Sequence, residues 1–175
     1  MNRKNAILLA LIALFALLAL GWTQVDAKAA PAGKTLKVKL NYAGAGIVDE
    51  QHKIYVLVLD SNPYMAKTLV DMTSQTAPAK NEATASAPSP EVCHILRREP
   101  ATAKDQTLTV SDLSASPVYV MAFFDKTGTY VAPDPPSGSP LGLYGKEPGK
   151  PEPIKLEEGK TVEVVLAFDD STKTP

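Results

Sequence analysis

Hydrophobic and polar residues alternate along several short stretches of this chain. In segment 35–42 the apolar side chains fall on every second residue, and segment 161–168 repeats this period. A period of two places one face of a strand in a core and the other face in water. Segments 54–59 and 118–124 are apolar at nearly every position, so we expect them to be central strands that are covered on both faces.

Shorter strand patterns occur between these segments, and turn-forming residues separate them. No amphipathic helix pattern is present after residue 30. A chain of about six to eight short strands with irregular turns is typical of an antiparallel sandwich. We therefore predict an all-β, antiparallel two-sheet sandwich, with its further strands in segments 68–72, 91–98, 107–111 and 154–156.

Two longer segments have no such period. Segment 74–90 consists mainly of Ala, Ser, Thr and Pro, which cannot bury enough apolar surface to offset the entropy of ordering. We expect it to be a mobile loop. Segment 131–153 contains seven prolines and four glycines. This density excludes a helix or a central strand, so a second long loop is expected there.

The N-terminus has the residue order of a secretory leader. Arg3 and Lys4 precede an unbroken apolar run over residues 6–20, and a short polar stretch with small residues follows. A helix of that run rises only about 22 Å, less than the roughly 30 Å hydrocarbon core. The pattern predicts a signal helix that is cleaved after Ala27 or as late as Ala29. The alternative is an uncleaved anchor, which would then be the chain's contact with the membrane.

The leader predicts an exported protein, in the periplasm, on the cell surface or in the medium. After residues 1–27, the remaining residues 28–175 amount to a single domain. The chain carries 18 basic and 19 acidic residues, a net charge of −1, with no basic stripe. Nucleic acid is therefore not expected as a partner.

Cysteine and histidine are scarce. Cys93 is the only cysteine, so it cannot form an internal disulfide. We expect it to be a small apolar core residue, and the alternative is a reactive thiol or an intermolecular bridge. His94 adjoins Cys93 and would point to the opposite face of a strand, while His52 is distant in sequence. Zinc takes three or four ligands, and no nucleophile motif is present. We predict no catalytic residue, no metal and no cofactor.

Asp125 begins a turn, Asp-Lys-Thr-Gly, directly after the apolar segment 118–124. With Asp134 it is a weak calcium candidate, but calcium takes six to eight oxygen ligands and usually several carboxylates. The alternative, which we favour, is that Asp125 caps the turn by accepting hydrogen bonds from backbone N–H groups.

The Pro/Gly-rich segment also carries apolar side chains. Leu141, Leu143 and Tyr144, together with Tyr130 just before the segment, form a candidate contact surface for a glycan or a protein. Loops on a rigid sandwich often carry function. The alternative is that these side chains fold back over an open end of the sandwich.

Residues 117–128, Pro-Val-Tyr-Val-Met-Ala-Phe-Phe-Asp-Lys-Thr-Gly, join an apolar strand to an Asp-x-x-Gly turn. With Tyr144-Gly145 and the final strand pair over residues 153–166, they resemble small exported bacterial β-sandwich domains of transthyretin-like or carboxypeptidase-regulatory-like (immunoglobulin-like) type. The resemblance spans about residues 111–170. The chain lacks the glycine that related domains often place before the Tyr strand, and it has only Asp125 where calcium-binding relatives carry several acids.

The resemblance implies a non-catalytic accessory, adhesive or carbohydrate-facing module. We therefore predict an exported binding or accessory module whose ligand is a carbohydrate or an envelope protein. Two alternatives stay open. One is a hydrolase or metal-dependent enzyme on the same scaffold, and the other is a purely structural envelope component.

Overall fold

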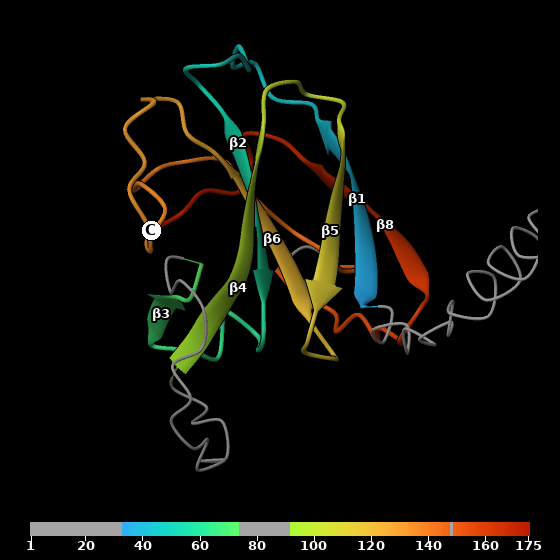
Figure 1. Cartoon of the computed structure of the whole chain (residues 1–175). Coiled ribbons are helices and arrows are strands. Elements are labelled where there is room, and N and C mark those ends of the chain that lie inside the picture. The colour runs from blue at the N-terminus through green and yellow to red at the C-terminus, as the bar shows by residue number, and fades with distance from the viewer. Residues whose placement is uncertain (1–32, 74–91, 148) are drawn as a thin grey trace, which may run out of the picture. The chain divides into compact units, whose positions relative to one another are not determined.

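A computed structural model describes residues 33–73, 92–147 and 149–175. These residues belong to one compact unit and form eight strands and no helix (Figure 1). None of the described segments is a helix that could cross a membrane. The strands are β1 (Lys34–Tyr42), β2 (Ile54–Leu59), β3 (Thr68–Asp71), β4 (Val92–Ala101), β5 (Thr107–Leu113), β6 (Tyr119–Phe124), β7 (Leu141–Leu143) and β8 (Thr161–Phe168).

The strands form two sheets, which confirms the predicted all-β, two-sheet architecture. One sheet has the order β5-β1-β8 and the other has the order β3-β4-β2-β6-β7. The expectation of purely antiparallel pairing is wrong for two pairs, because β8 runs parallel to β1 and β3 runs parallel to β4. Parallel neighbours need a long connection between them, and both pairs have one. Segments 1–27 and 74–90, predicted as leader and mobile loop, lie outside the described residues.

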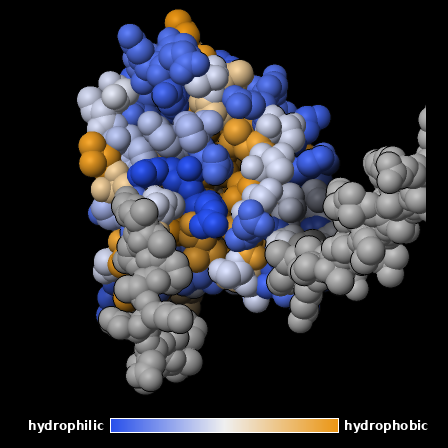
Figure 2. Space-filling model, in the orientation of Figure 1, coloured by the Kyte–Doolittle hydropathy of each residue, from blue (hydrophilic) through white to orange (hydrophobic). Residues whose placement is uncertain are grey.

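The main core lies between the two sheets. On β1, every second side chain is buried, from Leu36 to Tyr42, and β8 contributes Val164, Leu166 and Phe168. The ring of Tyr42 packs against Phe168, with ring centroids 4.8 Å apart. Figure 2 shows hydrophobic residues along the seam between the sheets, with hydrophilic residues on either side. The period of two in segments 35–42 and 161–168 therefore marks the core-facing side chains of the three-stranded sheet.

A second hydrophobic cluster covers the opposite face of the five-stranded sheet, which we call the outer face. Its buried members are Leu57, Leu59, Cys93, Ile95, Met121, Phe123 and Leu141. β2 and β6 are central in this sheet and supply residues to both clusters. This explains why segments 54–59 and 118–124 are apolar at almost every position.

The Pro/Gly-rich segment is not entirely irregular. Leu141–Leu143 forms the three-residue strand β7 at the edge of the five-stranded sheet, which the sequence did not predict. An edge tolerates prolines nearby because only one side of the strand needs donors. The short segment 154–156 forms a single bridge, Val118 to Ile154, instead of a strand.

Candidate binding site on the outer face

Three aromatic rings meet on the outer face and form what we call the aromatic cluster. Tyr55 comes from β2, Phe123 from β6, and Tyr130 from the segment after β6. The centroid of the Tyr130 ring lies 4.7 Å from those of Tyr55 and Phe123, and the Tyr55 and Phe123 rings stack at 5.6 Å. Phe123 is fully buried, so it is the floor on which the two tyrosines rest.

Arg98 and Asp71 stand beside this cluster. The Arg98 Nη1 atom lies 3.2 Å from the Asp71 Oδ2 atom, and the guanidinium carbon lies 5.7 Å from the centroid of the Tyr130 ring. A guanidinium over a tyrosine face is attracted by the ring quadrupole. Burial acts to raise the pKa of Asp71, but hydrogen bonds from Thr73 and the charge of Arg98 together hold that pKa below its usual value. The carboxylate is therefore charged at neutral pH.

A β-bulge decides which arginine reaches the aromatic cluster. One step along β2, from Leu59 to Val58, moves the partner on β4 by two residues, from Ile95 to Arg97. The extra residue shifts the alternation of β4 by one position. As a result Arg98 shares the outer face with Ile95, whereas strict alternation would have placed Arg97 there.

Asp125 fixes the turn that carries Tyr130. The Asp125 carboxylate is 1% exposed and accepts hydrogen bonds from the backbone N–H groups of Thr127, Gly128 and Tyr130, at 3.1, 3.0 and 2.8 Å. Gly128 has a φ of 66°, and a Cβ there would lie 2.6 Å from the Gln51 carbonyl oxygen. This is the arrangement expected of a turn-capping aspartate. Its two oxygens hold the backbone and thereby position Tyr130.

A pocket of about 430 Å³ opens against the aromatic cluster. Val131 on its rim is 82% exposed. The Tyr130 hydroxyl donates to the Pro133 carbonyl oxygen at 3.3 Å, and burial raises the pKa of Tyr130. The pocket therefore offers two aromatic rings, a guanidinium and a carboxylate to a ligand. It is lined by Tyr55, Asp71, Arg98, Tyr130, Val131 and Ala132.

Three of the four residues expected to form one contact surface, Tyr130, Leu141 and Leu143, belong to the hydrophobic cluster on the outer face, where they line two different pockets. Tyr130 lines the aromatic pocket, while Leu141 and Leu143 line a different pocket of about 400 Å³, together with Asp134. Tyr144 packs against the core between the sheets. The sequence pattern did not predict a site role for Tyr55, Arg98 or Asp71. The one available signal was Tyr55 itself, a tyrosine inside an otherwise aliphatic strand.

The cysteine and the histidines lie apart from this pocket. Cys93 is fully buried, as expected, and burial raises the pKa of its thiol. His52 pairs with Asp49 at 3.0 Å, and His94 pairs with Asp60 at 2.6 Å. Within the described ranges, no group of three or more His, Cys, Asp or Glu side chains could hold a metal ion.

Comparison of the chain with models of protein families, with curated proteins and with solved structures found no match. The likeness to transthyretin-like and carboxypeptidase-regulatory-like domains therefore depends on the motifs quoted above.

The charge pair in this pocket leads to a pH prediction. Asp71→Asn is expected to lower the free energy of unfolding at neutral pH, because it removes the carboxylate that pairs with Arg98. A carboxylate whose pKa is depressed by folding contributes stability above its unfolded value of about 3.9, and this contribution is lost as the pH falls through the folded pKa. Urea unfolding should therefore show a stability difference from the wild type that is full at neutral pH and shrinks in acid.

The control for this measurement is Asp134→Asn, since Asp134 is an exposed carboxylate outside the aromatic pocket. It should change stability little at any pH. A difference between Asp71→Asn and the wild type that stays constant from neutral to acidic pH would contradict the role of the charged pair.

Proposed function

We propose that this chain is an exported, non-catalytic binding module that holds a neutral saccharide in the aromatic pocket. The observation that carries this proposal is the partly buried ring of Tyr130, which lies between Tyr55 and Arg98 and lines the same pocket as Asp71. Export is supported by the leader pattern of residues 1–27. The transthyretin-like or carboxypeptidase-regulatory-like assignment is part of the same proposal and is supported by the motif over residues 117–128.

The chemistry of the pocket matches that of a sugar ring. A pyranose has apolar C–H faces and a rim of hydroxyl groups, so it needs a flat apolar wall and a few polar groups. Tyr55 and Tyr130 provide the wall. Arg98 supplies N–H donors and Asp71 supplies acceptor oxygens for hydroxyl groups. Because the two charges are paired, the pocket has little net charge, which favours a neutral ligand.

The same lining supports a binding role over a hydrolytic one. Glycoside hydrolysis generally uses two carboxyl groups that flank the scissile bond. The lining of the aromatic pocket includes one carboxylate, Asp71, and Arg98 holds it in an ion pair. An envelope protein is the other candidate ligand, and its side chains would meet the exposed Val131 on the rim.

Glycan-array binding followed by calorimetry tests the proposal. Tyr130→Ala is expected to weaken saccharide binding by roughly fivefold or more, since an aromatic contact contributes about 1 kcal/mol or more to affinity. Tyr144→Ala is the matched control, because Tyr144 packs against the core between the sheets. Near-ultraviolet circular dichroism verifies that both variants are folded.

Two outcomes would contradict the proposal. One is the absence of any saccharide that binds the wild-type protein. The other is equal weakening by Tyr130→Ala and Tyr144→Ala, which would place the ligand outside the aromatic pocket.

A further inference from the structure

The two sheets have four edge strands, and three of them are poorly suited to pairing with a strand of another chain. β3 has only four residues. β7 has three, and the C-terminal segment pairs beside it, with the Leu141 N–H donating to the Thr172 carbonyl at 2.9 Å. β5 is distorted at Asp112, whose φ is 56°, and Arg97 donates to the Asp112 carbonyl at 3.4 Å. Short strands, irregular backbone and charged side chains are the devices that prevent edges from pairing with other chains.

β8 is the exception. It has eight residues and pairs with β1 in a regular parallel register over its whole length. It contains no proline, glycine or lysine, and it has no strand partner on its other side among the described residues. In Figure 1 it lies at the right-hand side of the two sheets, next to β1. A long, regular edge of this kind presents a row of N–H and C=O groups that another strand can pair with.

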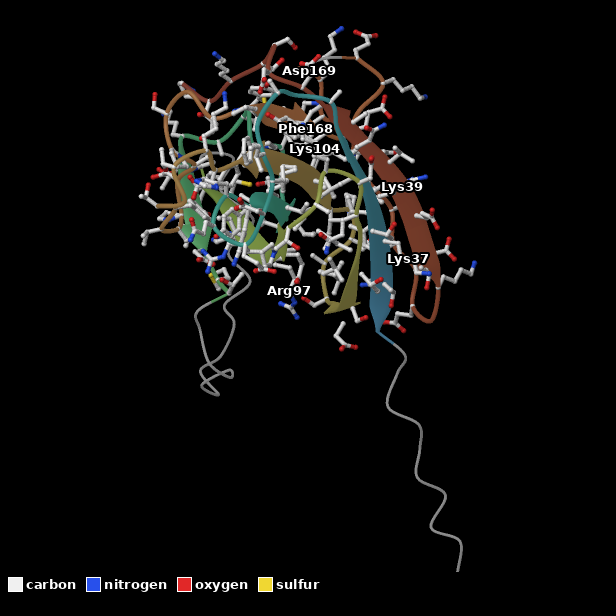
Figure 3. The ribbon with its side chains drawn as sticks, turned by 90° about the horizontal axis from the view of Figure 1, so that it is seen from above. Lys37, Lys39, Arg97, Lys104, Phe168 and Asp169 are labelled. Atoms are coloured by element: carbon white, nitrogen blue, oxygen red, sulfur yellow. The ribbon has the colours of Figure 1, made fainter. Side chains whose placement is uncertain are left out.

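The side chains of β8 show which partner fits. The face away from the core carries Thr161, Glu163, Val165 and Ala167, and Val165 is 56% exposed. Lys37 and Lys39 lie beside it on β1, opposite Glu163 and Val165 in the register (Figure 3). Glu163 already has a basic neighbour within its own sheet. The face therefore combines an apolar centre with one compensated charge.

We propose that β8 pairs antiparallel with β8 of a second copy of this chain, about a two-fold axis at Val165. Residues that oppose each other across an antiparallel pair share one face of the sheet. An axis at Val165 places the two Val165 side chains together and sets Glu163 against the small Ala167 of the second copy. An axis at Glu163 would place two carboxylates directly opposite, which is destabilising. Charge and apolar contact therefore select the same register.

The dimer formed in this way contains one continuous six-stranded sheet, because each copy contributes three strands. The core-facing rows also match, since Val164 meets Leu166 of the second copy. β8 lies in the three-stranded sheet, whereas the aromatic pocket is built on the five-stranded sheet. Pairing through β8 and saccharide binding therefore use separate surfaces, and either can be absent without the other.

Sedimentation velocity over a range of concentrations tests the pairing on protein produced from the full-length sequence. The wild type is expected to dimerise reversibly. Val165→Lys should weaken the dimer by roughly tenfold, because it replaces an apolar pair by two like charges directly opposite each other. Val165→Glu should do the same, and an equimolar mixture of the two variants should recover dimers because opposite charges then face each other.

The matched control is Ser111→Lys, which adds the same charge to an exposed position on β5, the other edge of the same sheet. It should leave the dimer unchanged. A wild-type protein that stays monomeric at every concentration would overturn the proposal. So would a dimer insensitive to Val165→Lys, a mixture without recovery, or equal weakening by Ser111→Lys.

Discussion

Asp125→Ala is expected to lower the free energy of unfolding by about 3 kcal/mol. The Asp125 carboxylate accepts hydrogen bonds from three backbone N–H groups and from the Thr127 hydroxyl at 2.8 Å. A hydrogen bond to a charged group contributes about 1.5–3 kcal/mol. The expected loss is well below the sum of the four bonds because Thr127 and Gly128 are exposed, so their freed N–H groups bond to water instead.

Urea denaturation checks this value, with Asp125→Asn as the matched variant. The asparagine keeps one acceptor oxygen at the same place, so we expect a smaller loss. Tyr130 is bound to the same carboxylate through its backbone N–H, so saccharide affinity should fall together with stability. If the alanine and asparagine variants were as stable as the wild type, the turn would be held by something other than Asp125.

Phe123→Ala should lower the free energy of unfolding by about 3–5 kcal/mol, the usual loss for a buried phenylalanine. Phe123 is fully buried on the outer face and contacts the rings of both Tyr55 and Tyr130. Its removal leaves a cavity beneath the aromatic pocket. A domain typically has only about 5–15 kcal/mol of stability, so this single change is a large fraction of the total.

Phe123→Leu is the control, because it retains much of the apolar volume while removing the ring. It should cost less stability than alanine but should still disturb the two tyrosines that rest on Phe123. Thermal unfolding and near-ultraviolet circular dichroism report these two effects separately. A loss below about 1 kcal/mol for Phe123→Ala would show that the outer cluster is not a second core.

The strands themselves could be predicted from local pattern. Alternation over 35–42 and 161–168 determined which side chains of β1 and β8 face the core, and the continuous apolar runs identified β2 and β6 as central. These features are local because a strand places every second residue on the same face. The capping role of Asp125 was also local, since the hydrogen bonds of its carboxylate all lie within five residues.

The candidate site was not predictable in the same way. Tyr55, Asp71, Arg98 and Tyr130 come from four separate segments, and their approach depends on the strand order β3-β4-β2-β6. Sheet order and parallel pairing depend on long connections, which carry no periodic signal. For Tyr144 the sequence led to the wrong expectation. Its position in the Pro/Gly-rich loop suggested a role on the surface, but the folded chain packs it against the core between the sheets.

By itself, then, the order of residues determined the strands, their buried faces and the turn at Asp125, because each depends on neighbours a few positions apart. Only the folded chain decided that Arg98 rather than Arg97 meets the aromatic cluster, since one extra residue in β4 reverses the alternation of every residue beyond it. The fold also decided that β8 lies at the edge of its sheet, because the position of a strand in a sheet depends on which strands pair and not on the composition of that strand.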